Sequence, residues 1–159
     1  PFLALSFYNL VPACSICNSS IKGDNVDFMP VHPYFNSLDD MFQFGIQIDK
    51  MEDLYKKETA FQITADAADK RAEEHIKLFK INERYKYHRD FANELLIRKK
   101  CYTNDYIESI KKFLDKHGIN YTDDFINCII TGNYTEPENI NKRPLAKLNK
   151  DIWKFVNLP

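Results

Sequence analysis

The chain has 159 residues, of which 44% are hydrophobic and 28% are charged, and its formal net charge is −1 at pH 7. A chain of this length forms one domain, or one domain with a small appendage. A net charge near zero gives no global field that attracts nucleic acid or an anionic membrane, so DNA binding would need a local basic patch. No apolar run approaches the roughly 20 residues that span a bilayer, and we expect no membrane partner.

The first 40 residues differ in composition from the rest. They hold four of the seven prolines together with clusters of Gly, Asn, Asp and Ser, which is typical of loops and turns. Residues 41–49 then alternate apolar and polar side chains, which predicts a strand, and residues 59–64 are a weaker second strand. We expect these strands to pair antiparallel, with residues 50–58 between them as an insert or a short helix.

Helical periodicity begins at Asp66 and continues to the end of the chain. The expected helices are one from Asp66 that carries Ala68, Ala72, Ile76 and Phe79 on one face, then residues 83–100, 104–117 and 123–131, and a last one that begins at Pro144. The last of these helices is expected to bury a stripe formed by Leu145, Leu148, Ile152 and Phe155, flanked by Trp153.

Threonines and glycines mark the ends of two of these helices. Thr103 and Thr122 are placed to cap their starts, and Gly118 and Gly132 to end them. The whole pattern predicts a mostly α, α+β fold, in which a short antiparallel strand pair is followed by a helical bundle. We expect residues 41–159 to pack on the segment 1–40 as one globular unit.

Four cysteines occur, and two of them form a C-x-x-C pair, Cys14 and Cys17. Two thiolates at this spacing can bind one zinc ion, but a closed structural site has four ligands, so the pair is half a site. Cys101 and Cys128 are distant in sequence and are expected to be buried as small apolar residues. So few cysteines do not make a disulfide scaffold, and a reducing cytoplasm is the expected location.

Two other interpretations of the C-x-x-C pair stay open. The thiols can be buried without any metal, which has about the same weight as the zinc half-site for this chain. A thioredoxin-like redox pair is less favoured, because it belongs in a strand–motif–helix context that the sequence does not show.

Residues around the pair extend the pattern. Asn9-Leu10 precedes it, Asn18 follows it directly, Lys22 comes shortly after, and His32-Pro33-Tyr34-Phe35 lies downstream. In this order and spacing, residues 1–35 resemble the HNH endonuclease family, whose ββα-metal fold places a strand pair and a helix around one divalent cation. Members of this subtype also carry another C-x-x-C and an Asp-His pair, which we expect upstream of Pro1, so the chain resembles an N-terminally truncated member.

The resemblance implies metal-dependent hydrolysis of a phosphodiester, with roles for individual residues. Asn9 would brace the loop of the general base, and Asn18 would ligate a catalytic Mg²⁺ or Mn²⁺. The C-x-x-C pair would be half of a structural zinc knuckle, and Lys22 would contact phosphate. His32 would line the cleft, orient a ligand or cap a turn.

The general base is not identified in this chain, because no histidine precedes Asn9. His75 and His88 fall within amphipathic helices and are expected to be structural. His117 suits a helix C-terminus. We therefore expect residues 1–159 by themselves to be weakly active or inactive.

Two groups of basic residues invite a nucleic-acid interpretation. Arg98-Lys99-Lys100, with nearby lysines, is better interpreted as a solvated surface balanced by acids. Lys147, Lys150 and Lys154 share one face of the last helix and could track phosphates, although this is the less favoured interpretation.

Three functional hypotheses follow. The first is an HNH-type nuclease that acts on nucleic acid, with DNA favoured, and whose helical region would bind DNA or a partner protein. The alternative is a non-catalytic helical module that binds nucleic acid or protein and keeps a vestigial zinc knuckle. The third is a small redox or metal-carrier protein.

Overall fold

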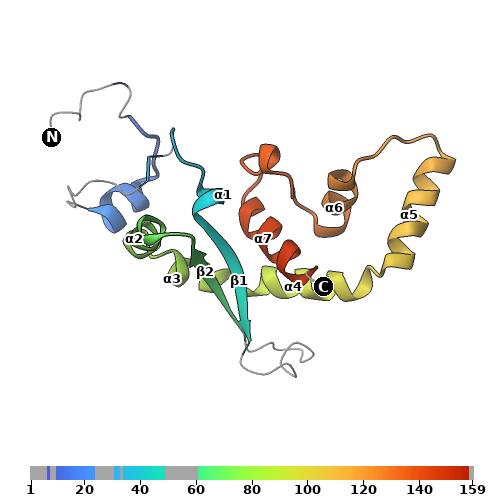
Figure 1. Cartoon of the computed structure of the whole chain (residues 1–159), viewed down its shortest axis with the longest axis horizontal. Coiled ribbons are helices and arrows are strands. Elements are labelled where there is room, and N and C mark those ends of the chain that lie inside the picture. Colours follow the sequence, from blue (N-terminus) through green and yellow to red (C-terminus); the bar gives the residue numbers. More distant parts are fainter. Residues whose placement is uncertain (1–6, 8–9, 24–30, 33, 49–60, 158–159) are drawn as a thin grey trace. The chain divides into compact units, whose positions relative to one another are not determined.

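The computed structural model describes residues 7, 10–23, 31–32, 34–48 and 61–157 (Figure 1). It is a mostly helical α+β fold in which a two-stranded antiparallel hairpin is followed by a series of helices, as the sequence predicted. No helix in these described ranges is long and apolar enough to cross a membrane. The insert expected at residues 50–58 lies outside the described residues.

The chain divides into two compact units. The N-terminal unit comprises residues 1–43 and 65–84, and the helical unit comprises residues 44–64 and 85–159. The division therefore passes through both strands of the hairpin. The sequence analysis placed a boundary at residue 40, between the segment that carries the HNH-like motif and the rest of the chain. That boundary stays a prediction.

The hairpin consists of β1, Phe42–Ile48, and β2, Phe61–Ala67. Alternate side chains along both strands are buried, which matches the period of two that predicted them. The second strand ends at Ala67, three residues after its predicted end at residue 64. The buried positions that follow this alternation are Phe42, Phe44, Ile46, Phe61, Ile63 and Ala65.

Helix α2 spans Lys70–Leu78, so the expected start at Asp66 is wrong. Strand β2 continues through Ala67, and Asp69 has an extended backbone and acts as the N-cap. Its carboxylate accepts a hydrogen bond from the backbone N–H of Ala72 at 2.8 Å, which satisfies one of the free donors of the first turn. The cap therefore sets the start of the helix, and Ala68 is not part of it.

The single helix expected over residues 83–100 is interrupted. Helix α3 spans Ile81–Tyr85, a 3₁₀ turn follows at Lys86–His88, and helix α4 spans Arg89–Cys101. Since helical propensity and periodicity both continue across the 3₁₀ turn, the sequence pattern did not reveal it.

The next two helices end where their capping residues predicted. Helix α5 spans Asn104–Lys116 and helix α6 spans Asp123–Thr131. The side chains of Thr103 and Thr122 each accept a backbone N–H from the first turn, and Gly132 adopts the left-handed conformation after α6. Each capping signal lies within a few residues of the helix end that it marks, which is why the sequence alone located these ends.

The last helix, α7, spans Ala146–Val156, and Pro144 is not in its first turn as expected. Leu145 stands at the N-cap with φ +59°, so the chain turns there before the helix begins. Of the predicted buried stripe, Leu148 and Ile152 are fully buried, but Phe155 is 40% exposed. The helix instead buries two polar side chains, Asn149 and Asp151.

Helices α4, α6 and α7 pack together in the helical unit. One cluster of its core contains Leu114, Ile126, Ile130 and Trp153. The two buried polar residues of α7 are held by hydrogen bonds. Asp151 accepts from the backbone N–H of Phe44 and pairs with Lys147, both at 3.0 Å.

Candidate functional site

The C-x-x-C pair lies at the start of a short π-helical turn, η2, which spans Ile16–Lys22. The turn ends at Gly23, whose φ of +54° is in the region that favours glycine and whose N–H donates to the carbonyl of Asn18 at 3.1 Å. A π-turn of this kind inserts one extra residue per turn, and such turns are frequent at functional sites. We call residues 14–23 the cysteine turn.

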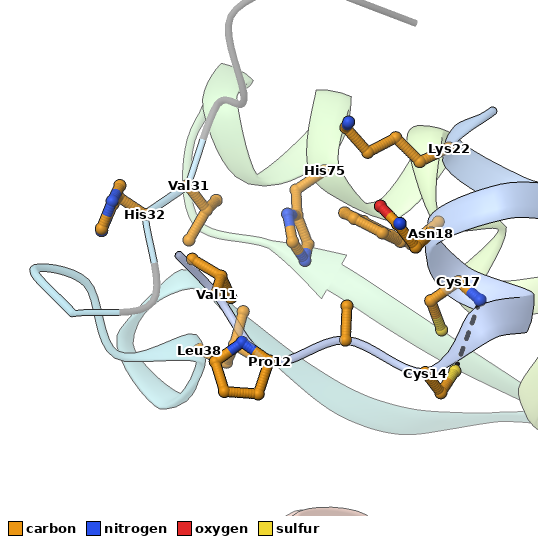
Figure 2. Close-up of a pocket in the computed structure, with 12 residues that line it drawn as sticks. Val11, Pro12, Cys14, Cys17, Asn18, Lys22, Val31, His32, Leu38 and His75 are labelled. Carbon is orange, nitrogen blue, oxygen red and sulfur yellow. Dashed lines mark hydrogen bonds between the residues drawn. The ribbon is translucent and has the colours of Figure 1, made fainter. Parts of the chain in front are cut away.

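The two cysteines are linked by a hydrogen bond of the type that supports metal-bound sulfur. The backbone N–H of Cys17 donates to Cys14 Sγ at 3.3 Å (Figure 2). Cys14 is exposed and Cys17 is partly exposed, so neither thiol is buried in the way that the metal-free interpretation supposed.

Electrostatics make the two thiols unequal. The backbone N–H of Cys17, and then its thiol, hold the pKa of Cys14 below its usual value. Its hydrogen bond with Cys14, followed by desolvation, raises the pKa of Cys17, and the nearby guanidinium of Arg84 opposes this shift. Arg84 Nη1 lies 3.5 Å from Cys17 Sγ. Cys14 is therefore the more readily ionised thiol, and a thiolate is the form that binds metal or reacts.

A pocket of about 500 Å³ opens beside the cysteine turn, within the N-terminal unit. Figure 2 shows side chains from the cysteine turn on one side of it and the ring of His75, from α2, extending into its centre. We call it the His75 pocket. Its lining residues are Val11, Pro12, Ala13, Cys14, Cys17, Asn18, Lys22, Val31, His32, Leu38, His75 and Phe79.

His75 is the buried polar residue of this pocket. It is only 9% exposed, and its Nδ1 has no hydrogen-bond partner among the described residues. Its ring lies 4.7 Å from the ring of Phe79, at an interplanar angle of 47°. Burial lowers the pKa of His75, so the imidazole is neutral at neutral pH.

Asn18 and Lys22 belong to the same turn as the cysteines. Asn18 is exposed and Lys22 is partly buried, and both project toward the side of the pocket where His75 lies (Figure 2). The structure thus brings together five of the six residues that the HNH resemblance singled out, because His32 also lines the pocket. The sixth, Asn9, lies outside the described residues.

His32 lines the pocket and also organises a turn. Its carbonyl accepts the backbone N–H groups of Phe35 and Asn36 at 3.0 and 2.9 Å, and its Nδ1 accepts that of Tyr34 at 3.4 Å. The hydroxyl of Tyr34 donates to the carbonyl of Leu10 at 2.8 Å, which fastens this turn to the segment before the cysteines. Of the three roles expected for His32, turn formation and lining of the cleft both describe its position.

The metal ligands available here amount to half a site. Within the described residues, no group of three or more His, Cys, Asp or Glu side chains is arranged to hold a metal ion. The exposed thiol of Cys14, the adjacent Cys17 and their N–H···S bond suit one half of a tetrahedral zinc site. Asn18 offers a hard oxygen ligand of the kind that Mg²⁺ and Mn²⁺ prefer.

The predicted phosphate-tracking face of α7 is not an open row of lysines. Lys147 pairs with Asp151, Lys150 lies 4.0 Å from the same carboxylate, and their side chains are only 16% and 15% exposed. Lys154 is exposed. All three belong to the helical unit. Lys147 and Lys150 stabilise a buried carboxylate, and a joint role of the three lysines in binding phosphate stays a prediction.

The basic run in α4 is also engaged within the chain. Arg98 donates to the carbonyls of Ile130 and Thr131 at the end of α6, and Lys99 donates to Asn157.

The two remaining cysteines differ from expectation as well, since Cys101 is exposed and Cys128 is partly exposed. Cys101 is the last residue of α4.

Sequence reasoning assigned His75 a structural place and missed its position in the pocket. The prediction put it within an amphipathic helix, and α2 does bury it, together with Ala72 and Ile76. The pocket that faces this helix is formed by residues far away in sequence, so no local pattern could indicate it.

No protein-family model, no curated protein and no solved structure matches this chain.

Proposed function

We propose that this chain carries the second half of an HNH-type active site and belongs to a metal-dependent nucleic-acid endonuclease. One observation carries the proposal. The Cys17 N–H supports the Cys14 sulfur, and the same turn presents Asn18 and Lys22 at one pocket. A metal knuckle, an oxygen ligand and a cation within nine residues are what this chemistry requires at that place.

The residues have separate roles in this proposal. Cys14 and Cys17 would hold a structural zinc that fixes the turn, and Lys22 would bind the phosphate oxygens of the substrate backbone. Asn18 provides an oxygen ligand for a divalent cation, which when bound would polarise the scissile phosphate. The proton acceptor for the attacking water and the remaining zinc ligands are expected from residues upstream of Pro1.

A longer chain that includes the residues encoded upstream of Pro1 tests the proposal. We expect an Asp-His pair and a second C-x-x-C in those residues, about one equivalent of zinc by mass spectrometry, and Mg²⁺- or Mn²⁺-dependent nicking of plasmid DNA. The Asn18→Ala variant should lose nicking while it keeps its zinc. Asn120→Ala, an exposed asparagine of the helical unit, is the matched control and should cleave normally.

Two outcomes would contradict the proposal. Upstream residues without an Asp-His pair would remove the proton acceptor that the chemistry needs. Salt-sensitive DNA binding with no cleavage in any divalent cation would instead favour the non-catalytic nucleic-acid-binding module.

A further inference from the structure

The imidazole of His75 requires an explanation. A buried polar atom without a hydrogen bond costs about 1–3 kcal/mol in general, and native proteins rarely leave one without a reason. The Nδ1 of His75 is enclosed and has no hydrogen-bond partner among the described residues, and the ring that carries it, on a residue that is 9% exposed, extends into the pocket (Figure 2). Nothing in the proposed nuclease chemistry uses it.

The walls of the pocket suit a flat, largely apolar group. Val11, Pro12, Val31 and Leu38 line it, and Phe79 adds an aromatic ring. Its volume of about 500 Å³ lies within the roughly 300–1,000 Å³ of sites that take small organic ligands. Bases commonly stack on aromatic side chains, because every base has a π-face.

The polar groups of the pocket are few and of two kinds. The ring of His75, which extends into the pocket, offers an imidazole edge that can accept or donate a hydrogen bond (Figure 2). Lys22 is the one lysine or arginine among the described lining residues, and it offers an ammonium. A ligand that satisfies both has a heterocycle with a hydrogen-bonding edge and an anionic group.

We propose that the His75 pocket holds one unstacked nucleotide, with its base beside Phe79, the edge of the base at the imidazole of His75 and its phosphate at Lys22. This inference rests on the proposed function and narrows it, because a base that is paired and stacked in a duplex cannot enter a pocket. The expected substrate is nucleic acid with at least one unpaired nucleotide.

Fluorescence anisotropy with the full chain tests the proposal. The probes are a fluorescein-labelled single-stranded oligonucleotide and a hairpin duplex of the same composition. We expect tighter binding of the single strand, and binding about tenfold weaker in His75→Phe, which keeps a flat buried ring but lacks the nitrogens. His88→Phe, outside the pocket, is the matched control and should bind like the wild type.

Two results would overturn the proposal. One is equal affinity for the single strand and the hairpin. The other is a His75→Phe variant that unfolds at the wild-type temperature and binds the single strand as tightly as the wild type. If His75→Phe does not fold, Phe79→Leu replaces it, and unchanged binding by that folded variant is equally decisive.

A second arm distinguishes nucleic acid from free nucleotides. Calorimetry with deoxyadenosine monophosphate should give weak binding that depends on His75, and the mononucleotide should compete with the single strand. Mononucleotide binding that depends on His75, without binding of the oligonucleotide, supports the pocket and assigns it to a free nucleotide. Absence of binding for both probes overturns it.

The result can be separated from the fate of the proposed nuclease. Cleavage that depends on Asn18, together with binding that is indifferent to His75, overturns only the pocket assignment. Binding that depends on His75, without any cleavage that depends on Asn18, overturns only the nuclease.

Discussion

The two units of this protein bury polar groups in different ways. In the helical unit, Asp151 accepts a backbone N–H and a lysine ammonium, and the amide nitrogen of Asn149 donates to Thr131 Oγ1 and to the carbonyl of Tyr134. In the N-terminal unit, His75 Nδ1 has no partner among the described residues, and the residue itself lines a pocket. Asn149 Oδ1 also lacks one, but it belongs to a side chain that is wholly enclosed and already bonded.

This difference separates buried polar groups that stabilise the fold from buried polar groups that are available for function. A buried polar group that is satisfied by neighbouring helices fixes how those helices pack. A buried polar group that faces a cavity is available to a ligand. We therefore expect substitutions in the helical unit to change stability, and substitutions in the N-terminal unit to change binding and reactivity.

The largest effect is expected for Asp151→Ala. The change leaves the Phe44 N–H and the Lys147 ammonium, which is only 16% exposed, without their buried acceptor. Removing one partner of a buried pair costs about 3–5 kcal/mol. Urea denaturation followed by the fluorescence of Trp153, the one tryptophan in the chain, measures the loss.

Asp123→Ala provides the control for that experiment. Asp123 also pairs with a lysine, Lys111, at 2.9 Å, but its side chain is 87% exposed. We expect a far smaller loss of stability there, because solvent screens exposed pairs. Equal losses at the two positions would remove the basis for treating the buried network as structural.

A pair of glycine substitutions tests whether Arg98 serves packing in the helical unit. Gly118 and Gly132 both follow helices with φ of +65° and +74°. Gly118→Ala meets open space and should cost about 1 kcal/mol through backbone strain alone. Gly132→Ala should cost about 2–3 kcal/mol, because its Cβ would lie 2.9 Å from Arg98 Nη1 and disturb the bonds to the end of α6.

The same urea experiment measures both variants. A double variant that combines Gly132→Ala with Arg98→Ala checks the cause, since the excess cost of the glycine change should disappear. An excess that persists without Arg98 would mean that contact with this arginine is not the cause of the excess.

Acid should destabilise the N-terminal unit through His75. Burial lowers the pKa of His75 in the folded state, so the unfolded state binds its proton first as the pH falls. Stability is complete above the ordinary imidazole pKa of about 6.5 and declines below it, by at most about 1.4 kcal/mol per pH unit, until the folded pKa is reached.

Hydrogen exchange of the α2 amides at a series of pH values measures this effect locally. His75→Phe should flatten the dependence in α2, whereas His88→Phe should leave it unchanged. A wild-type profile that shows no decline would indicate that the imidazole is solvated in the folded protein.

The smallest effect on stability, and the clearest on reactivity, is expected at the cysteine turn. The lowered pKa of Cys14 should make it react with iodoacetamide faster than Cys17 near neutral pH, as peptide mass spectrometry can follow. Cys17→Ala should slow Cys14 without unfolding the chain, because it removes the thiol that supports the Cys14 sulfur. Added zinc should protect both cysteines if they form a metal knuckle, and equal rates with and without zinc would argue against one.

Local signals in the sequence determined much of the fold. The alternation over residues 41–49 and the caps Thr103 and Thr122 located a strand and two helices, because each signal lies within a few residues of what it specifies. The predictions failed where a longer-range contact intervened. Helix α2 begins later than expected because β2 is extended by pairing with β1, and Phe155 is exposed because α7 turns polar residues inward.

The candidate site divides in the same way. The sequence by itself singled out Cys14, Cys17, Asn18 and Lys22 as one motif, because these ligating or charged residues lie within nine positions. Only the tertiary structure placed His75 beside that motif, 53 residues beyond Lys22, and put its ring at a pocket. Burial and cavities depend on which distant segments meet, and a sequence pattern carries no such distance.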